Sequence, residues 1–343
     1  MARRNRSAGG GDEDGEAGFV LLSVLLAAML FVAVAASFAV RARLVTLQTA
    51  NLSDMAKAQA LADGAALFAA DALRSPKPPA PGEEALIAAA LSGTAPAPAP
   101  QAALPLPVDG SPVSCALSSG ERLDLSVTDQ GALLDLNGAS VPMLRDMLEA
   151  TGLDGETARR LANEIGDFRD PDDDPQDNGI GERAQYRQAG LAWGPANRPF
   201  VDVEEVARLP SMNPARLAAL RSLLTVLNPR AGLDLGLTPA ASRGVLPADA
   251  VNLPALSRWS LASPRTSFAV EARLRRPDGS VAAGRRALVA FGGQDRGTLR
   301  ILRWSRPPFE GEPRIRPPSE DGVCQALVGA LDMASTASAS IRP

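Results

Sequence analysis

Acidic side chains crowd one short stretch of the chain, "GDFRDPDDDPQDNGIGERAQYRQAG", which begins at Gly166. Few cations stand beside them, so their charges repel one another unless solvent or a bound ion relieves the crowding. Carboxylate oxygens are the hard ligands that calcium prefers. The stretch therefore predicts either a calcium-binding loop or a solvated acidic loop with aspartate caps. Its acids are Asp167, Asp170, Asp172, Asp173, Asp174, Asp177 and Glu182.

The acidic stretch is not an EF-hand. Asp170, Asp172 and Asp174 have the spacing of the first ligands of that loop, but Pro175 stands where the EF-hand needs a glycine for its sharp turn. Glu182 misses the last ligand position by one residue. Any calcium site here would have a different loop geometry.

The residues needed for common enzyme chemistry are missing. Histidine is absent from all 343 residues, which excludes catalysis with an imidazole base and zinc sites built on imidazole. We find no nucleophile paired with a base, no phosphate-binding loop and no cofactor fingerprint. A membrane-tethered, metal-dependent hydrolase using the acidic stretch would need a general base, and none is evident. We expect a protein that is not an enzyme.

A second motif, "FVDVEEVARLPSMNPARLAAL", resembles a helix-hairpin-helix unit, and "LDLNGASVPMLRDML" is a weaker relative. Hairpins that bind DNA need glycines so that backbone N–H groups can approach phosphate. Ser211 and Asn213 occupy those places here. From Gly131 to Ala231 there are 11 arginines, no lysine and 16 acids, so phosphate binding is disfavoured. We expect a small packed helical fold without nucleic acid.

The sign of the charge reverses later in the chain. From Ala262 to Arg316 there are 12 arginines against 5 acids, whereas the whole chain carries a formal charge of only -4. This region either meets an acidic partner or is an ordinary sheet face along which arginine stems pack. The sequence leaves both possibilities open.

The elements that position these motifs follow an apolar N-terminal segment. No residue from Phe19 to Val40 is charged, and as a helix this run spans about 33 Å, enough to cross the hydrocarbon core. The helical pattern continues until Ser75-Pro76. Read as one helix, Phe19 to Arg74 would reach about 84 Å, with a lipid-embedded first half and an amphipathic second half.

The rest of the chain predicts an α+β fold, in which one β-sheet is interrupted by an inserted α-domain. Alternating patterns predict strands at "ERLDLSVT", "ALLDL", "FAVEARLRR", "RRALVAF" and "TLRILRW". Between them, helix starts are predicted at Ser140, Asp154, Asp202, Asn213 and Thr238. Residues 75–112 look like a linker with one helical candidate, Glu83 to Leu91, and the tail "MASTASASIRP" looks disordered.

The chain has two cysteines, Cys115 and Cys324. In an exported domain two distant cysteines can form a disulfide. Two unpaired buried thiols fit equally well, because sequence alone does not give the distance between them.

A resemblance to type IV prepilins lies at the N-terminus. A polar leader ends in Gly18, and Phe19 opens the unbroken apolar helix. In that family a membrane peptidase cuts after the glycine and methylates the new N-terminus, which implies cleavage between Gly18 and Phe19. Most pilin-like proteins have glutamate five residues into the mature helix, where this chain has Ser23. A serine suits a filament-tip subunit with no neighbour for a carboxylate to pair with, or it simply bonds to its own helix.

Taken in order, the motifs resemble type II secretion system protein K, the largest minor pseudopilin. The middle stretch, "IGDFRDPDDDPQDNGIGERAQYRQAGLAWGPANRPFVDVEEVARLPSMN", carries most of the resemblance, and "LDLGLTPAASRGVL" adds to it. In the family this region belongs to an α-domain inserted in a pilin-like fold and carries calcium. The resemblance implies five candidate calcium ligands, namely Asp170, Asp172, Asp173, Asp174 and Glu182.

The resemblance also implies a role and a location. The protein would be a prepilin peptidase substrate in the inner membrane, with a cytoplasmic N-terminus and a periplasmic C-terminal domain. It would join minor pseudopilins I and J in a tip complex that starts the pseudopilus for protein secretion. The alternative is a membrane-anchored helix-hairpin-helix DNA receptor of the competence type.

The expected segments are a leader (1–18), a transmembrane helix (19–40), its periplasmic continuation (41–75), a linker with the first β-residues (76–136), the inserted α-domain (137–250), the last strands (251–318) and a tail (319–343).

Overall fold

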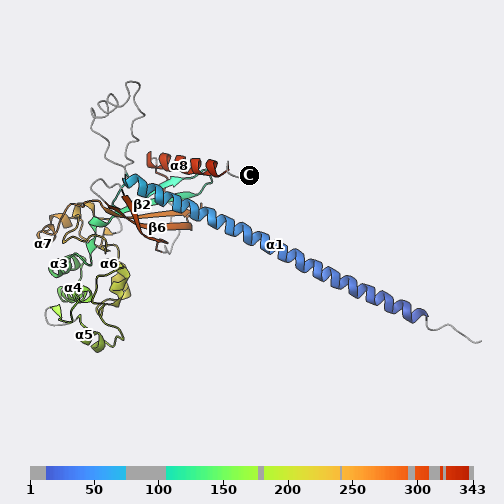
Figure 1. Cartoon of the computed structure of the whole chain (residues 1–343), viewed down its shortest axis with the longest axis horizontal. Coiled ribbons are helices and arrows are strands. Elements are labelled where there is room, and N and C mark those ends of the chain that lie inside the picture. Colours follow the sequence, from blue (N-terminus) through green and yellow to red (C-terminus); the bar gives the residue numbers. More distant parts are fainter. Residues whose placement is uncertain are drawn as a thin grey trace, which may run out of the picture. The chain divides into compact units, whose positions relative to one another are not determined.

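The structure is a computed structural model that describes residues 13–74, 106–176, 181–239, 242–292, 298–308, 317–319 and 322–339. The chain divides into two compact units, Met1–Lys57 and Ala58–Pro343. The first unit contains most of one long helix. The second contains the end of that helix, a five-stranded sheet and a helical insert (Figure 1).

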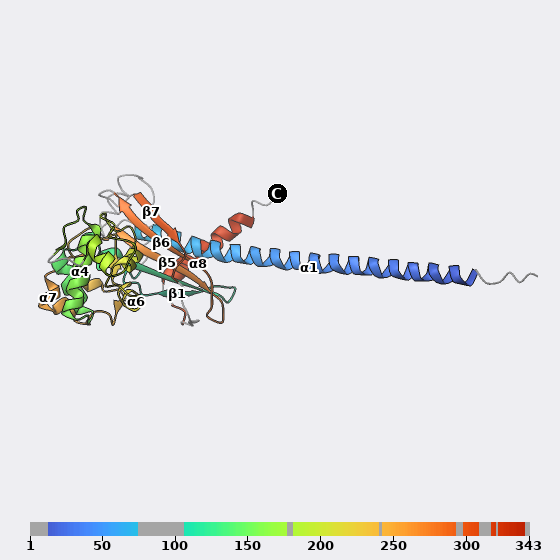
Figure 2. The same cartoon turned by 90° about the horizontal axis from the view of Figure 1, so that it is seen from below.

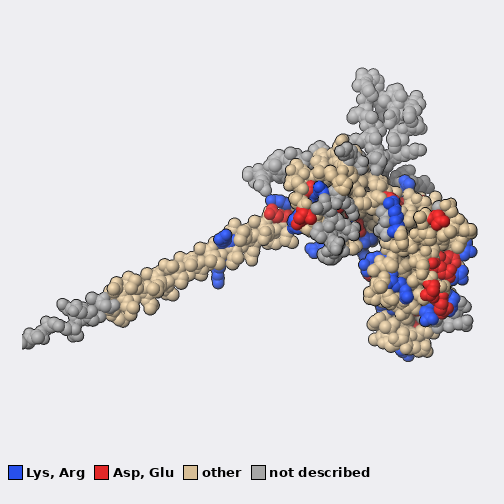
Figure 3. All heavy atoms as spheres, turned by 180° about the vertical axis from the view of Figure 1, so that it is seen from behind, with Lys and Arg blue, Asp and Glu red and all other residues tan. Residues whose placement is uncertain are grey.

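Helix α1 runs from Glu13 to Arg74 without a break, because no proline interrupts the sequence before Pro76. Among the described residues it is the one helix long and apolar enough to cross a membrane. Its apolar stretch appears in Figure 3 as a rod without charged side chains. These features fit a single-pass membrane anchor, as the sequence predicted.

The last turns of α1 bury a row of alanines against the sheet. Small side chains let the helix backbone lie close to the strands, and the row spans Ala62, Ala65, Ala66, Ala69 and Ala70. A polar bond adds to this contact, since Arg285 donates from Nε to Asp63 Oδ1 at 2.6 Å. The C-terminal part of α1 is therefore the core helix of the sheet domain.

The sheet is antiparallel throughout, with strand order β1-β2-β5-β6-β7. Figure 2 shows β5, β6 and β7 side by side. Alternate residues of the strands, including Leu125, Val270 and Val289, face the core with α1. The strands are β1 (Val113–Ala116), β2 (Arg122–Asp129), β5 (Ser267–Arg275), β6 (Val281–Gly292) and β7 (Thr298–Ser305).

A disulfide joins Cys115 of β1 to Cys324 at the start of helix α8 (Gly322–Ala339). This settles the question that the sequence left open. Leu331 of α8 approaches Gly64 of α1, and Figure 1 shows the two helices on the same side of the sheet. The sequence prediction of a disordered tail was wrong as far as Ala339, because a run of alanine, serine and threonine can extend a helix that is anchored at its start.

The insert lies between two strands that are neighbours in the sheet, β2 and β5. A short parallel pair, β3 (Leu134–Asp135) with β4 (Leu224–Thr225), forms a second small sheet at its base. The predicted boundaries of 137–250 lie inside this span. The helices of the insert are α3 (Val141–Ala150), α4 (Gly155–Arg169), α5 (Arg183–Gln188), α6 (Pro214–Leu220) and α7 (Pro254–Ser257), with 3-10 turns η1 (Gln130–Ala132), η3 (Val203–Arg208), η4 (Leu235–Leu237) and η6 (Ala250–Asn252).

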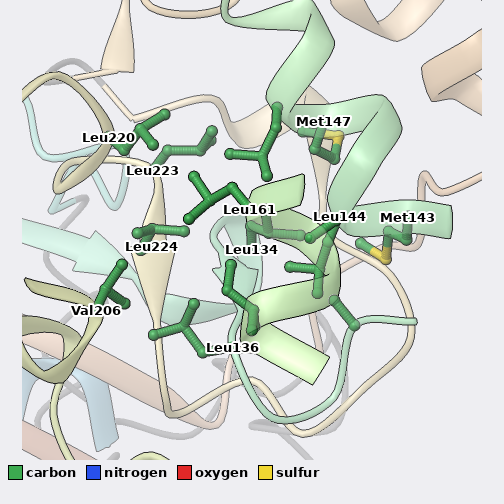
Figure 4. Packing of buried hydrophobic residues seen from close by; sticks show 14 of the residues in the cluster. Leu134, Leu136, Met143, Leu144, Met147, Leu161, Val206, Leu220, Leu223 and Leu224 are labelled. Atoms are coloured by element: carbon green, nitrogen blue, oxygen red, sulfur yellow. The ribbon is translucent and has the colours of Figure 1, made fainter. Parts of the chain in front are cut away.

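The insert has its own hydrophobic core (Figure 4). Leu144 of α3 and Leu161 of α4 meet Leu134 of β3 and Leu224 of β4 in this core, and all four are buried. The predicted N-caps hold, since Ser140 caps α3 and Asp154 caps α4 through their side chains. Two separate cores explain why a helical insert can interrupt one sheet.

Several predicted elements differ in detail. Leu224 belongs to β4 and not to a helix, because α6 ends at Leu220. The segment "ALLDL" contributes β3 to the small sheet and no strand to the main one. The predicted helix start at Thr238 stands next to residues 240–241, which lie outside the described residues. The helical candidate from Glu83 to Leu91 lies outside the described residues.

Candidate metal centre in the helical insert

The acidic stretch joins the end of α4 to the start of α5. Asp167 lies on the last turn of α4, Asp170 is its C-cap, and Glu182 is the N-cap residue of α5. Phe168 stacks on Phe200 with ring centroids 4.3 Å apart, which fixes the end of α4 against a later segment of the insert. The helix ends and this stacking therefore hold the acids in a defined place.

Asp167 is fully buried. Its Oδ1 accepts a hydrogen bond from the backbone N–H of Gln176 at 2.8 Å, whereas its Oδ2 has no partner among the described residues. Gly181 passes so close that a Cβ there would overlap the Asp167 carboxylate. Burial raises the pKa of Asp167 to about 6, and the charge of Asp170 also acts in this direction. Only glycine fits at position 181.

Glu182 is also buried, and neither of its carboxylate oxygens has a hydrogen-bond partner among the described residues. Burial raises the pKa of this carboxyl to about 7, and the negative charges of Asp167, Asp170 and Asp173 contribute. A buried carboxylate without partners is costly in a folded protein. The described part of the chain therefore provides no partner for the Glu182 carboxylate.

The other predicted ligands lie along the loop after α4. Asp170 has one buried oxygen, Oδ1, without a partner, and its Oδ2 accepts from Gln176 Nε2 at 3.3 Å. Asp172, Asp173 and Asp174 are exposed. Asp172 Oδ1 accepts from the Asp174 N–H at 3.0 Å, which is a local turn bond.

Asn197 also faces this loop, and the sequence prediction did not name it as a site residue. Its Nδ2 donates to Asp172 O at 2.9 Å and to Asp173 Oδ1 at 3.1 Å, while its buried Oδ1 has no partner among the described residues. Its φ of 47° is in the left-handed region. The conspicuous "NRPF" run was the available signal. Asn197 therefore brings a neutral amide oxygen without a described partner to the acidic loop.

The nearest arginine does not neutralise these acids by hydrogen bonding. Arg169 donates from both terminal nitrogens to backbone carbonyls of Leu136 and Ala139. Its guanidinium thereby links α4 to the base of the insert. Burial raises the pKa of the Asp170 carboxyl and outweighs the charge of Arg169, which acts through space and favours a lower pKa.

The donor set fits calcium in type, because all unpartnered atoms at this loop named above are hard oxygens. The arrangement is less complete, since among the described residues no three acidic side chains converge closely enough to hold one ion. Asp177 belongs to the same stretch and lies outside the described residues. The described residues therefore provide the type of ligand atom that calcium prefers. They do not form a complete coordination shell.

The helix-hairpin-helix unit has a buried carboxylate at its hairpin. Ser211, between η3 and α6, donates to Glu164 of α4 from its backbone N at 3.0 Å and from its Oγ at 2.6 Å. Glu164 is fully buried. In DNA-binding hairpins such an N–H is offered to phosphate, and here an internal acid already takes it. This contact argues against the DNA-receptor alternative.

A long N-terminal helix whose last turns pack on an antiparallel sheet is the pilin-like α+β arrangement, and this chain has it with a large helical insert. Residues 124–229 match the model of a family described as type II secretion system (T2SS), protein K. This match runs from within β2 to beyond β4, and over these residues the chain is similar to protein K of the type II secretion system.

A solved structure with a similar chain is the crystal structure of the GspK-GspI-GspJ complex from enterotoxigenic Escherichia coli. The likeness has a TM-score of 0.46 at 14% sequence identity, and it covers 58% of this chain and 84% of that chain. None of the curated proteins matches this chain.

Proposed function

We propose that the protein is the minor pseudopilin at the tip of the type II secretion pseudopilus. There it would start assembly of the filament and support export of folded proteins across the outer membrane. The observation that carries this proposal is the family match over residues 124–229, which falls mainly on the helical insert. The insert, from η1 to α7, contains more residues than the five strands together. Such bulk would obstruct a further subunit but suits a cap.

Ser23 supports the same position. Its Oγ donates to the backbone carbonyls of Val20 at 2.9 Å and Phe19 at 3.0 Å, so it is satisfied within its own helix. A glutamate there would need a partner in lipid. Because Ser23 requires no partner from another subunit, this helix is suited to a subunit that lacks a neighbour on one side.

The proposal includes processing and orientation. A prepilin peptidase would cut between Gly18 and Phe19 and methylate the new N-terminus. The helix would then stay in the inner membrane as a single pass, with its N-terminus in the cytoplasm and the sheet and insert in the periplasm. Arg3, Arg4 and Arg6 favour this orientation.

Replacement of Gly18 tests this part of the proposal. Gly18→Glu should leave an unprocessed, larger membrane form and stop secretion, and immunoblotting of membrane fractions would measure the size. Gly15→Ala, in the same leader, is the matched control and should be trimmed normally. Normal trimming and normal secretion in the Gly18 variant would contradict the proposal.

The proposed partners are minor pseudopilins I and J. The test is co-purification of the full chain with each of them from detergent-solubilised membranes. We expect a complex of all three proteins that survives size-exclusion chromatography. Failure of the processed protein to associate with either partner would count against a tip complex.

We also propose that the insert binds calcium through Asp170, Asp172, Asp173, Asp174 and Glu182. The buried oxygens without partners on Asp170 and Glu182 support this proposal. The ion would supply positive charge that holds the loop together, and we assign no catalytic step to these residues. Calcium should raise the melting temperature of the full chain in detergent, and Asp172→Ala with Asp174→Ala should abolish the gain. An equal gain in both proteins would contradict this assignment.

A further inference from the structure

The two edges of the main sheet differ. At the β1 edge, Ser319 covers the strand, since its backbone N donates to Ser114 O at 2.7 Å and its Oγ accepts from Ser114 N at 3.2 Å. At the other edge, β7 pairs with β6 alone among the described residues. An uncovered strand edge offers backbone N–H and C=O groups to another chain.

Strand β7 also exposes large apolar side chains. Ile301 is 47% exposed, Leu302 43% and Trp304 37%. Ile301 is paired with Val289 and Trp304 with Ala287, and both of these β6 residues face the core with α1. Directly paired residues share a face of the sheet. Ile301 and Trp304 therefore form an apolar border on the α1 face, along the strand that pairs with β6 alone among the described residues.

The opposite face of the same edge opens into a cleft of about 490 Å³ between the sheet and the insert. Leu288 of β6 and Arg303 of β7 line it from the sheet. Val201, which is 61% exposed, and Glu204 line it from the insert. The edge of β7 thus separates an apolar border from a cleft.

The charge on the cleft side is positive. Arg221, Arg286, Arg303 and Arg306 line the cleft, against the acids Asp202 and Glu204. Arg303 pairs with Asp202 and Arg221 with Glu204, which uses up both acids.

Arg306, one of these four, and one further arginine, Arg300, carry the surplus charge at this edge. Arg306 and the exposed Arg300, which is paired with Ala290 on the cleft side, have no ion-pair partner in the described part of the chain. This surplus would attract a carboxylate-bearing segment.

We propose that β7 is a docking edge for an extended acidic segment of a partner protein. The segment adds to the sheet as a strand, with its main chain bonded to β7. Its acidic residues face the arginines at the cleft and its apolar residues cover Ile301 and Trp304, which share a face because the register shifts at Leu302. A second copy of this chain is disfavoured as the occupant, since pairing β7 with β7 would bring arginines beside arginines.

This inference does not depend on the position at the filament tip. Its test uses the full chain in detergent micelles and a fluorescein-labelled, end-capped peptide in which glutamate alternates with valine. A matched peptide has lysine in place of glutamate. Fluorescence polarisation should show the acidic peptide binding at least about tenfold more tightly, with an affinity that falls as salt rises.

Two controls separate strand addition from loose electrostatic attraction. Arg300→Ser with Arg306→Ser should weaken binding about tenfold, while Arg276→Ser, an exposed arginine in the turn between β5 and β6, should leave it unchanged. Methylation of alternate peptide nitrogens should abolish binding, because it removes main-chain donors. Equal binding of the acidic and lysine peptides, no binding of the acidic peptide, or unchanged binding after N-methylation would overturn the proposal.

Discussion

Two buried carboxylates show how the sheet domain and the insert differ. Asp124 of β2 accepts from Ser114 Oγ at 2.7 Å and from Arg275 Nε at 2.6 Å, and Arg275 is itself buried. Glu182 of the insert is equally buried but has no hydrogen-bond partner among the described residues. Asp124 is thus satisfied from within the chain, whereas Glu182 has no partner in the described part.

This difference indicates where each region gets its stability. An ion pair, a disulfide and the packing of α1 stabilise the sheet domain. The acidic loop of the insert gathers like charges whose pKa values are raised. We therefore expect the sheet domain to respond to changes in its own residues, and the loop to respond to pH and to cations.

The largest expected effect follows from breaking the Asp124–Arg275 pair. Arg275→Met leaves a buried carboxylate without its cation and should reduce the free energy of unfolding by about 3–5 kcal/mol. Urea denaturation of the full chain in detergent measures it. The neighbouring exposed Arg276→Met should change stability by less than about 0.5 kcal/mol. If Arg275→Met lowered the free energy of unfolding no more than the control does, the Asp124–Arg275 pair would not be what stabilises the sheet domain.

Loss of the disulfide should have the next largest effect. Cys115→Ser with Cys324→Ser releases α8 from β1 and should cost about 2–4 kcal/mol. Thermal unfolding with and without calcium measures it. We expect the same cost in both conditions, since the disulfide lies in the sheet domain and the acids in the insert. A cost that disappears in calcium would contradict the separation of the two regions.

A smaller effect of opposite sign is expected for Glu182→Gln in calcium-free buffer. Because the pKa of Glu182 is raised to about 7 in the folded chain, the folded state holds a proton that the unfolded state releases above its own lower pKa. The stability of the parent protein should then fall as pH rises from about 4.5 to about 7.

Glu182→Gln removes this charge and should stabilise the calcium-free protein by about 1 kcal/mol at pH 8, with little effect at pH 4.5. Melting temperatures at both pH values measure it. Asp124→Asn is the comparison from the sheet domain and should destabilise the protein at pH 8, since it weakens the bond to Arg275. Destabilisation by Glu182→Gln in calcium-free buffer would mean that this carboxylate is already satisfied.

Much of the fold could be predicted because its signals are local. The alternation in "FAVEARLRR" and "TLRILRW" predicted β5 and β7, and the cap residues Ser140 and Asp154 predicted the starts of α3 and α4. The strand β1 was missed because its four residues do not alternate clearly. The short strand β4 was also missed, because its leucine continues the period of α6.

Contacts between distant residues could not be predicted from one sequence. The pairing of Cys115 with Cys324 depends on α8 lying beside β1. The bond from Ser211 to Glu164 joins a loop to α4, and the bond from Asn197 to Asp173 joins two loop segments. In each case the partners are far apart in the chain. Composition did indicate the acidic loop itself, but burial of Glu182 and Asp167 required the fold.

We propose that the acidic loop of the insert binds a calcium ion. Equilibrium dialysis of the full chain, freed of metal by a chelator, against calcium at neutral pH tests this most directly. We predict stoichiometric binding by the parent protein and its loss in the Asp172→Ala, Asp174→Ala double variant. No calcium bound by the parent protein at millimolar concentration would contradict the claim and leave a solvated acidic loop.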